Sequence, residues 1–211
     1  MPRDPKEFDL PVRLFKDQNA WEKWPSANHA KSRGIWMRIA KKGSGVRSAN
    51  YQEALDVALC YGWIDGRKES FDETSWLQRF TPRGARSVWS KINTGKAQAL
   101  IESGRMQPAG LAAIESAKAD GRWESAYQPS STAEVPPEMQ AALDRNPKAK
   151  AFFETLRGTN RYAIIFRVHT AKRPETRAKR VAEFIERLER GETIRDMQKA
   201  LDAKKKKKKK A

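Results

Sequence analysis

The stretch YQEALDVALCYGWIDGRKESFDETSWLQRFTPR, residues 51–83, decides the fold of this chain. Residues 51–60 place apolar side chains on one face at helical spacing and polar side chains on the other, and Gly62 follows. The apolar face consists of Tyr51, Ala54, Leu55, Ala58 and Leu59. This pattern predicts a short amphipathic helix that ends at Gly62, with Leu55 and Leu59 buried in a core.

The second part of the same stretch predicts a β-hairpin. Trp63 resumes the chain in an extended conformation, and residues 76–80 alternate as a returning strand. Between them, Asp65-Gly66 is a dipeptide that is typical of turns. We expect the helix and the hairpin to share one core, with Trp63 buried in it.

Flanking segments extend this domain. Residues 8–15 predict a short edge strand, and residues 34–40 (GIWMRIA) predict a second strand after a helix that carries Trp21 and Trp24. Beyond the hairpin, Ser87 is expected to cap a further helix. The sequence therefore predicts a small antiparallel sheet packed with helices.

The C-terminal part of the chain has a different pattern. Residues 128–137 (QPSSTAEVPP) are small, polar and rich in proline, which predicts a linker, and only helical periodicity follows. We expect an α+β fold in which an all-α region follows the sheet domain and a disordered polylysine tail ends the chain. The expected boundaries are 1–127, 128–137, 138–197 and 198–211.

The charge balance suggests a polyanionic partner. The chain of 211 residues has a formal charge of +17, and without seven consecutive lysines it still carries 36 basic and 26 acidic residues. These lysines are Lys204, Lys205, Lys206, Lys207, Lys208, Lys209 and Lys210. Such a balance favours non-specific attraction to nucleic acid or anionic surfaces, although the tail could equally serve only solubility.

The residues that usually carry metal or redox chemistry are sparse. Cys60 is a lone cysteine, which excludes an intramolecular disulfide and fits a reducing compartment. His29 has no further ligands at metal-binding spacing, and His169 lies on an apolar stripe, where we expect a packed histidine rather than a base. We therefore expect no metal and no cofactor. The N-terminus lacks a signal-peptide pattern and no segment is apolar enough to span a membrane, so we expect a cytoplasmic protein.

A loop at residues 41–47 (KKGSGVR) could bind an anion. It connects a predicted strand to a predicted helix N-terminus, where free N–H groups attract negative charge, and Lys41, Lys42 and Arg47 add charge. It lacks the third glycine of a dinucleotide fingerprint, so a plain flexible loop remains the alternative.

Several motifs together resemble a known family. They are EALDVALCYGWIDGR at 53–67, FTPR at 80–83, SVWSKIN at 87–93, GRM at 104–106, AKADGRW at 117–123, and NPKAKAFFETL with AKRPETRAKRV in the C-terminal helices. In this combination the chain is similar to the YdeI/OmpD-associated, or bacteriocin-protection, family over roughly residues 8–191. The polylysine tail departs from the family pattern.

The resemblance implies a role in protection against bacteriocins and antimicrobial peptides, and it implies no catalytic residue or cofactor. Simple sequestration of cationic peptides conflicts with the charge, because a protein of +17 repels them within a Debye length of about 8 Å. We expect instead a non-enzymatic stress or resistance factor that binds an unknown protein or a small anionic ligand. The candidate contact residues are Trp63, Asp65, Arg67, Arg83, Trp89 and Asn93, at turns and strand ends.

Two alternatives stay open. The first is polyanion binding by the basic surface and the polylysine tail. The second is an enzyme that acts on a small anionic substrate with Asp65 or Glu69 as the acid or base. The chain, however, contains no Ser/His/Asp order of catalytic residues, no HExxH motif and no clustered ligands.

Overall fold

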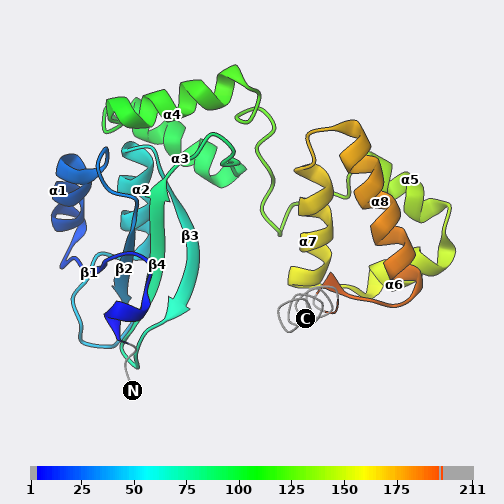
Figure 1. Ribbon diagram of the computed structural model, residues 1–211, viewed down its shortest axis with the longest axis horizontal. Coiled ribbons are helices and arrows are strands. Elements are labelled where there is room, and N and C mark those ends of the chain that lie inside the picture. Colours follow the sequence, from blue (N-terminus) through cyan, green and yellow to red (C-terminus); the bar gives the residue numbers. More distant parts are fainter. Residues whose placement is uncertain (1–3, 195, 197–211) are drawn as a thin grey trace, which may run out of the picture. The chain divides into compact units, whose positions relative to one another are not determined.

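The computed structural model describes residues 4–194 and 196, and the chain divides into two compact units, Met1–Ala126 and Tyr127–Ala211 (Figure 1). Each unit has a hydrophobic core of its own. The α+β fold class is confirmed, with a small sheet and helices in the first unit and only helices in the described part of the second. The tail predicted to be disordered lies outside the described residues.

The first unit combines a four-stranded sheet with helices. Its elements are the 3-10 helix η1 (Pro5–Glu7), β1 (Val12–Leu14), α1 (Gln18–Asn28), β2 (Ile35–Ala40), α2 (Tyr51–Cys60), β3 (Trp63–Ser70), β4 (Ser75–Pro82), α3 (Lys91–Glu102) and α4 (Pro108–Ala119). The strand order is β1-β2-β4-β3. The prediction of an antiparallel sheet is wrong at one pair, because β1 and β2 are parallel. The helix α1 connects these two strands, and a crossover of this kind is what a parallel pair requires.

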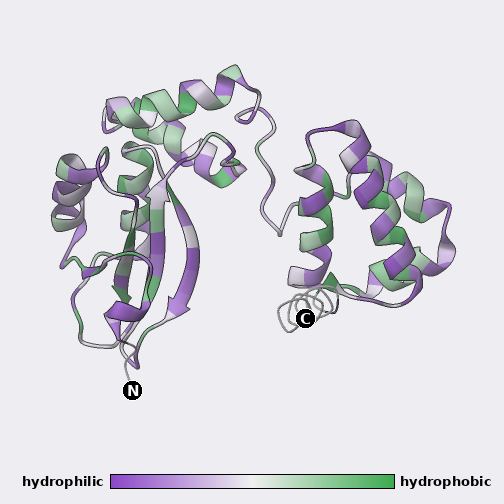
Figure 2. Ribbon diagram, in the orientation of Figure 1, coloured by the Kyte–Doolittle hydropathy of each residue, from purple (hydrophilic) through white to green (hydrophobic). Residues whose placement is uncertain are grey.

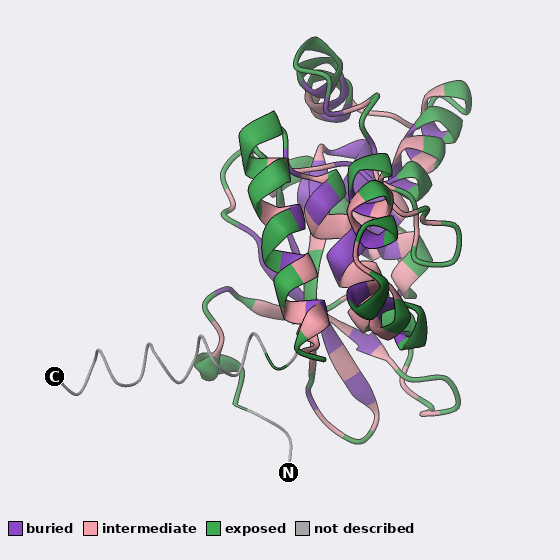
Figure 3. Ribbon diagram, turned by 90° about the vertical axis from the view of Figure 1, so that its right-hand side faces the viewer, coloured by how far each residue is buried: buried purple, intermediate pink, exposed green. Residues whose placement is uncertain are grey.

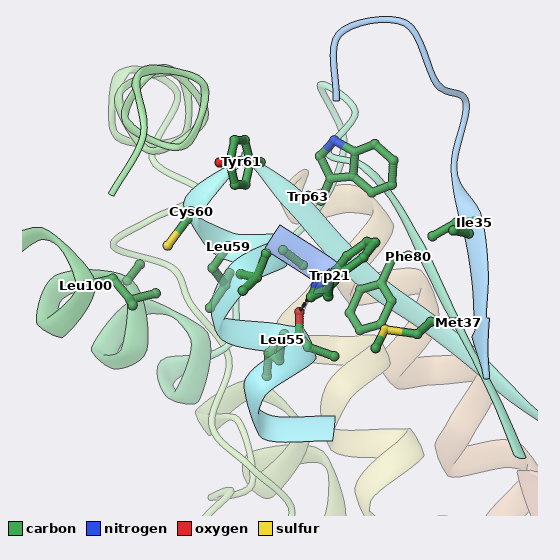
Figure 4. Close-up of a cluster of buried hydrophobic side chains, with 14 of the residues drawn as sticks. Trp21, Ile35, Met37, Leu55, Leu59, Cys60, Tyr61, Trp63, Phe80 and Leu100 are labelled. Carbon is green, nitrogen blue, oxygen red and sulfur yellow. Dashed lines mark hydrogen bonds between the residues drawn. The ribbon is translucent and has the colours of Figure 1, made fainter. Parts of the chain in front are cut away.

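The helix α2 forms as predicted because both its start and its apolar face are specified. Asn50 accepts hydrogen bonds from the backbone N–H groups of Gln52 and Glu53, while the Glu53 carboxylate accepts one from the Asn50 N–H, which completes a capping box. Leu55 and Leu59 are buried in the main core, as expected. Figure 4 shows Leu55 and Leu59 packed together with Trp21. The Trp21 indole N–H donates to the Ala54 carbonyl oxygen at 3.1 Å.

The hairpin is confirmed, but its turn lies elsewhere. The strands β3 and β4 pair in antiparallel fashion, and Trp63 is buried with 1% of its surface exposed. The prediction of a turn at Asp65-Gly66 is wrong, since both residues lie inside β3 at a β-bulge. The chain turns at residues 71–74, where Asp72 accepts hydrogen bonds from the Thr74 N–H and the Ser75 hydroxyl. This side-chain bonding makes the later site the better turn.

The region after the hairpin differs from the prediction at one cap. Ser87 does not cap α3; its hydroxyl accepts a hydrogen bond from the Gly84 N–H, and the N-cap is Ser90, which accepts from the Asn93 N–H. The helix α4 then approaches the end of α2 closely, because Gly110 has no side chain to separate them. A second, smaller cluster of buried residues contains Leu10, Trp36, Phe71 and Leu77.

All seven tryptophans of the chain lie in the first unit. They are Trp21, Trp24, Trp36, Trp63, Trp76, Trp89 and Trp123. Each is buried or partly buried in one of the two clusters, and Trp21, for example, stacks on Trp24 with ring centroids 5.7 Å apart. Large aromatic side chains thus supply much of the core of the first unit.

The part of the second unit that the structure describes contains four helices, as the helical periodicity predicts. They are α5 (Pro137–Asp144), α6 (Pro147–Thr155), α7 (Gly158–His169) and α8 (Pro174–Glu189). Their buried residues form a single cluster that includes Met139, Leu143, Phe153 and Phe184. Buried and exposed residues alternate along the helices (Figure 3), and α8 is mostly hydrophilic with hydrophobic residues at intervals (Figure 2). No helix among the described residues is long and apolar enough to cross a membrane.

Candidate functional site

A groove of about 790 Å³ lies between α5 and α8 within the second unit. Its floor is apolar and consists of Ala142, Ala178, Val181, Ala182 and Ile185. The two helices run side by side in the same direction, since Arg177 near the start of α8 bonds Glu138 near the start of α5, and Asn146 after the end of α5 bonds Glu189 at the end of α8. A pocket of this size and lining is typical of a binding site.

The sequence of α8 builds one wall of the groove from two ridges with a spacing of four residues. One ridge is Pro174, Ala178, Ala182 and Glu186, and the other is Arg177, Val181, Ile185 and Glu189. The adjoining face, which carries Phe184 and Leu188, is buried in the core, and the second ridge borders it, since Val181 also belongs to the core cluster and Ile185 packs against it. Because Ala178 and Ala182 are exposed and small, the wall is shallow enough for the backbone of another segment to approach α8.

The charges on the rim differ between the two ends of the groove. The end at the start of α8 carries Lys172, Arg177 and Glu138, a sum of +1. The end at the close of α8 carries Arg145, Glu186 and Glu189, a sum of −1. The net charge of the rim therefore changes from positive to negative along the length of the groove.

Two of the rim carboxylates, Glu138 and Glu186, are held in place by arginine side chains. The Glu138 pKa is lowered by a hydrogen bond from its own backbone N–H and by Arg177, whose Nη1 lies 2.9 Å from the Glu138 carboxylate. The Glu186 pKa is lowered by a hydrogen bond from Arg190 at 2.6 Å. Lys172 and Arg145 make no ion pair with any residue that the structure describes. These two cations are therefore available to an incoming group.

The geometry of the groove suits a helix. From Pro174 to Glu189 the wall is about 22 Å long, or about four helical turns, at the usual rise of 1.5 Å per residue. An apolar floor between two charged rims is the arrangement that accepts an amphipathic helix through its apolar face. Among residues 4–194 and 196, no group of three or more His, Cys, Asp or Glu side chains could hold a metal ion.

Sequence reasoning missed this groove. The inward residues Val181, Phe184, Ile185 and Leu188 are predictable from the helical period, but the charges around them suggest an ordinary solvated face. The signal that could have revealed the site is the pair Ala178 and Ala182, which continues an apolar stripe beyond the face that the core needs.

Two of the six predicted contact residues in the first unit are core residues. Trp63 and Trp89 each expose 1% of their surface and belong to the main cluster. Arg83 lies over the Trp89 ring, 3.4 Å from its centroid, and donates to the Val88 carbonyl oxygen. These three residues therefore lie in the packed interior of the first unit or at its border.

The other members of that set lie in different surroundings. Asp65 accepts a hydrogen bond from the Tyr51 hydroxyl at 2.8 Å. Arg67 lies over Trp36, in the smaller cluster, and 3.5 Å from Glu69. Asn93 is 9% exposed in the first turn of α3. The structure thus brings Arg83 and Trp89 together, while Asp65 and Arg67 contact other residues. None of the six residues lines the α5–α8 groove or the small pocket beside Tyr61.

The predicted anion-binding loop at residues 41–47 is tied to its surroundings. Lys41 donates to the Asp72 carbonyl oxygen at 3.0 Å, and Arg47 lies 3.5 Å from Asp17, while Lys42 is exposed. The capping box of α2 already occupies backbone donors at the helix start that follows this loop. The lysines from Lys204 to Lys210 lie outside the described residues.

The remaining chemically notable residues have ordinary environments. Cys60 is fully buried, and burial raises the pKa of its thiol to about 11. The His29 ring nitrogen lies 2.8 Å from the Pro25 carbonyl oxygen. The prediction that His169 is packed on an apolar stripe is wrong, because it is exposed at the last residue of α7.

Comparisons with known proteins match two separate parts of the chain, and the boundary between the two units, after Ala126, lies in the interval between the two matches. Residues 132–191 match the family model described as Bacteriocin-protection, YdeI or OmpD-Associated. Residues 13–113, which contain the ALCYGWIDG and FTPR motifs, match a separate model described as a domain of unknown function. Searches of curated proteins and of solved structures give no match. The α5–α8 groove falls within the first of these matches.

Proposed function

Residues 132–191 match the family model described as Bacteriocin-protection, YdeI or OmpD-Associated, and on this basis we propose that the protein is a non-catalytic cytoplasmic resistance factor. It acts by binding an amphipathic helix of a protein partner in the α5–α8 groove. The observation that carries the proposal is the groove itself, which has a volume of about 790 Å³ and an apolar floor between charged rims, within the residues that match the family model.

Partner binding accounts for protection better than capture of the toxic peptide. Antimicrobial peptides are commonly cationic, and the protein has a formal charge of +17, so long-range attraction between them is absent. The groove also holds two cations, Lys172 and Arg145, that make no ion pair among residues 4–194 and 196. An acidic or mixed-charge helix meets these groups more favourably than a cationic one.

The test is capture of partners from cell extract by the full chain, with and without nuclease. Ala182→Arg places a long charged side chain on the exposed floor of the groove, so we expect it to abolish capture of nuclease-resistant protein partners. The matched control is Ala151→Arg, the same change at an exposed position of α6 that does not line the groove. Equal capture by the wild type and Ala182→Arg would refute the proposal.

Polyanion binding is a second candidate, and one cluster of charge favours it. The first half of α8 and the segment before it carry Lys172, Arg173, Arg177, Lys179 and Arg180 against only one acidic residue. If these groups and the tail contact phosphates, log affinity for nucleic acid should fall with log salt at a slope near −0.9 per phosphate neutralised. Deletion of Lys204–Lys210 should flatten that slope, and absence of binding at low salt would rule this candidate out.

A further inference from the structure

The groove wall of α8 is complementary to itself. When two identical helices pack antiparallel around a two-fold axis, the residue numbers of every facing pair add up to the same total. With the axis between Val181 and Ala182, these two residues face each other, and Ala178 faces Ile185. Both pairs belong to the floor of the groove. An apolar seam is therefore continuous across the axis; it presents the exposed Ala178 and Ala182 and the half-buried Ile185, while Val181 is already buried in the core of its own copy.

The same axis brings opposite charges of the two copies together. It places Arg177 opposite Glu186 of the second copy, and it does so twice because the axis relates the two copies. It also places Pro174 opposite Glu189, so that every residue that α8 contributes to the groove faces another residue of the groove. The end with a sum of +1 meets the end with a sum of −1. This closure follows from the regular helical spacing of the two ridges, so the distinguishing feature of this wall is that Arg177 and Glu186 carry opposite charges.

Packing permits the approach that this pairing needs. Ala178 and Ala182 are exposed and carry no side chain beyond Cβ, so two α8 helices can come close at the centre of the seam. Ile185 is only half-buried within one copy and can complete its burial against Ala178 of the second copy. The helix α5 supplies the second wall, through Ala142, so the two copies together make a layer of four helices.

We propose that the helix accepted by the α5–α8 groove is α8 of a second copy of this chain, in an antiparallel, two-fold symmetric dimer. The inference rests on the proposed function in one respect, since it uses the same groove as a helix-binding site. The apolar seam drives association, and the Arg177–Glu186 pairs fix the register and direction. A partner helix that enters the groove then has to displace the second copy.

The experiment is a charge-reversal pair in the full chain, followed by analytical ultracentrifugation across a range of concentrations. The wild type should pass from 24.1 kDa to twice that mass as concentration rises. Arg177→Glu alone places like charges opposite each other at both positions, and Glu186→Arg alone does the same with the opposite sign. Each single variant should dimerise at least about tenfold more weakly.

Mixing the two single variants gives the decisive result. In a mixed dimer the two substituted positions face each other as an inverted ion pair, and the two unsubstituted positions keep the original pair. The equimolar mixture should therefore associate although neither variant does so alone, and the double variant R177E/E186R should also recover the dimer. Loss of structure cannot imitate this recovery, and circular dichroism of each variant checks its fold, since Arg177 also bonds Glu138 and the Ala171 carbonyl oxygen.

Two further variants complete the test. Glu183→Arg makes the same charge change as Glu186→Arg at an exposed position of α8 outside the groove, and it should leave the dimer unchanged. Ala182→Arg disturbs no ion pair and should give a monomer. A wild type that is monomeric at all concentrations, or a dimer indifferent to these changes, overturns the inference. If the wild type is monomeric and Ala182→Arg still loses partner capture, the proposed function stands without the dimer.

Discussion

At the scale of single residues, Asp72 is the carboxylate that most clearly couples stability to pH. Its pKa is lowered from 3.8 to about 2, first by the Ser75 hydroxyl, then by Thr74 and by Arg38, which lies 2.7 Å away. A lowered pKa stabilises the folded state above the unfolded pKa, and this stabilisation is lost as the pH falls through the folded pKa. Because the turn borders solvent, we expect the contribution to be about 1–2 kcal/mol.

Asp72→Asn should therefore lower the free energy of unfolding by about 1–2 kcal/mol at neutral pH. The difference from the wild type should shrink between about pH 4 and pH 2, where the wild-type carboxyl takes up its proton. Urea unfolding of both proteins across this range measures it. A difference that stays constant with pH would show that Asp72 acts through packing and not through its charge.

Cys60 should be inert in the folded protein. The thiol is fully buried, and burial raises its pKa to about 11, so at about pH 8 the reactive thiolate is scarce and shielded from reagents. We expect an aromatic disulfide reagent to label it only after denaturant is added. Rapid labelling of one equivalent in the native state would contradict the environment described above.

Single residues also show where prediction from sequence stops. The predicted burial of Trp63 is confirmed, because its place after an amphipathic helix determines which face it joins. The predicted turn at Asp65 is wrong, because a bulge inside a strand depends on the partner strand, and the local pattern Asp-Gly is shared by turns and bulges. The bonding of Asp72 within its own turn is the better local signal.

At the scale of elements, the contact between α4 and α2 depends on Gly110. A Cβ atom there would lie 2.4 Å from the Cys60 carbonyl oxygen and 2.9 Å from the Leu59 carbonyl oxygen. Gly110→Ala should lower the free energy of unfolding by about 2–3 kcal/mol, because backbone atoms cannot yield as a flexible side chain does. Thermal unfolding followed by circular dichroism measures the change.

The matched control is Gly95→Ala, the same substitution inside α3. A Cβ atom at Gly95 has nothing within 4 Å, so only helix propensity changes and the variant should be more stable by about 0.5–1 kcal/mol. Opposite signs for the two glycines would confirm that close approach, and not helix propensity, determines the role of Gly110. Equal effects would contradict the packing of α4 on α2.

Elements with both a cap and an apolar face are predictable from sequence, and the relations between elements are less so. The helix α2 has its Asn50 cap and its stripe within a short stretch of sequence, so local rules suffice. Local rules cannot predict the parallel pairing of β1 with β2, because it depends on how α1 leads the chain from the end of β1 to the start of β2. The groove between α5 and α8 depends on two helices separated by two others, and only the surplus alanines on α8 hint at it.

At the scale of the whole molecule, the two hydrophobic cores share no residue. Phe153, which exposes 2% of its surface, belongs to the cluster of the second unit. Phe153→Ala should destabilise that unit by about 3–5 kcal/mol while the first unit keeps its stability. Calorimetry should show one transition moving to lower temperature and the other unchanged. A single transition that moves as a whole would show that the units unfold together.

The tryptophans of the first unit have a practical consequence for such experiments. Because all seven lie within residues 1–126, fluorescence excited at the red edge of the indole band reports on that unit alone. Far-ultraviolet circular dichroism reports on both, with helices in each. A change in circular dichroism without a change in tryptophan fluorescence therefore reports on the second unit without any label. Tryptophan fluorescence thus reports on the first unit, and the second unit contributes no tryptophan signal.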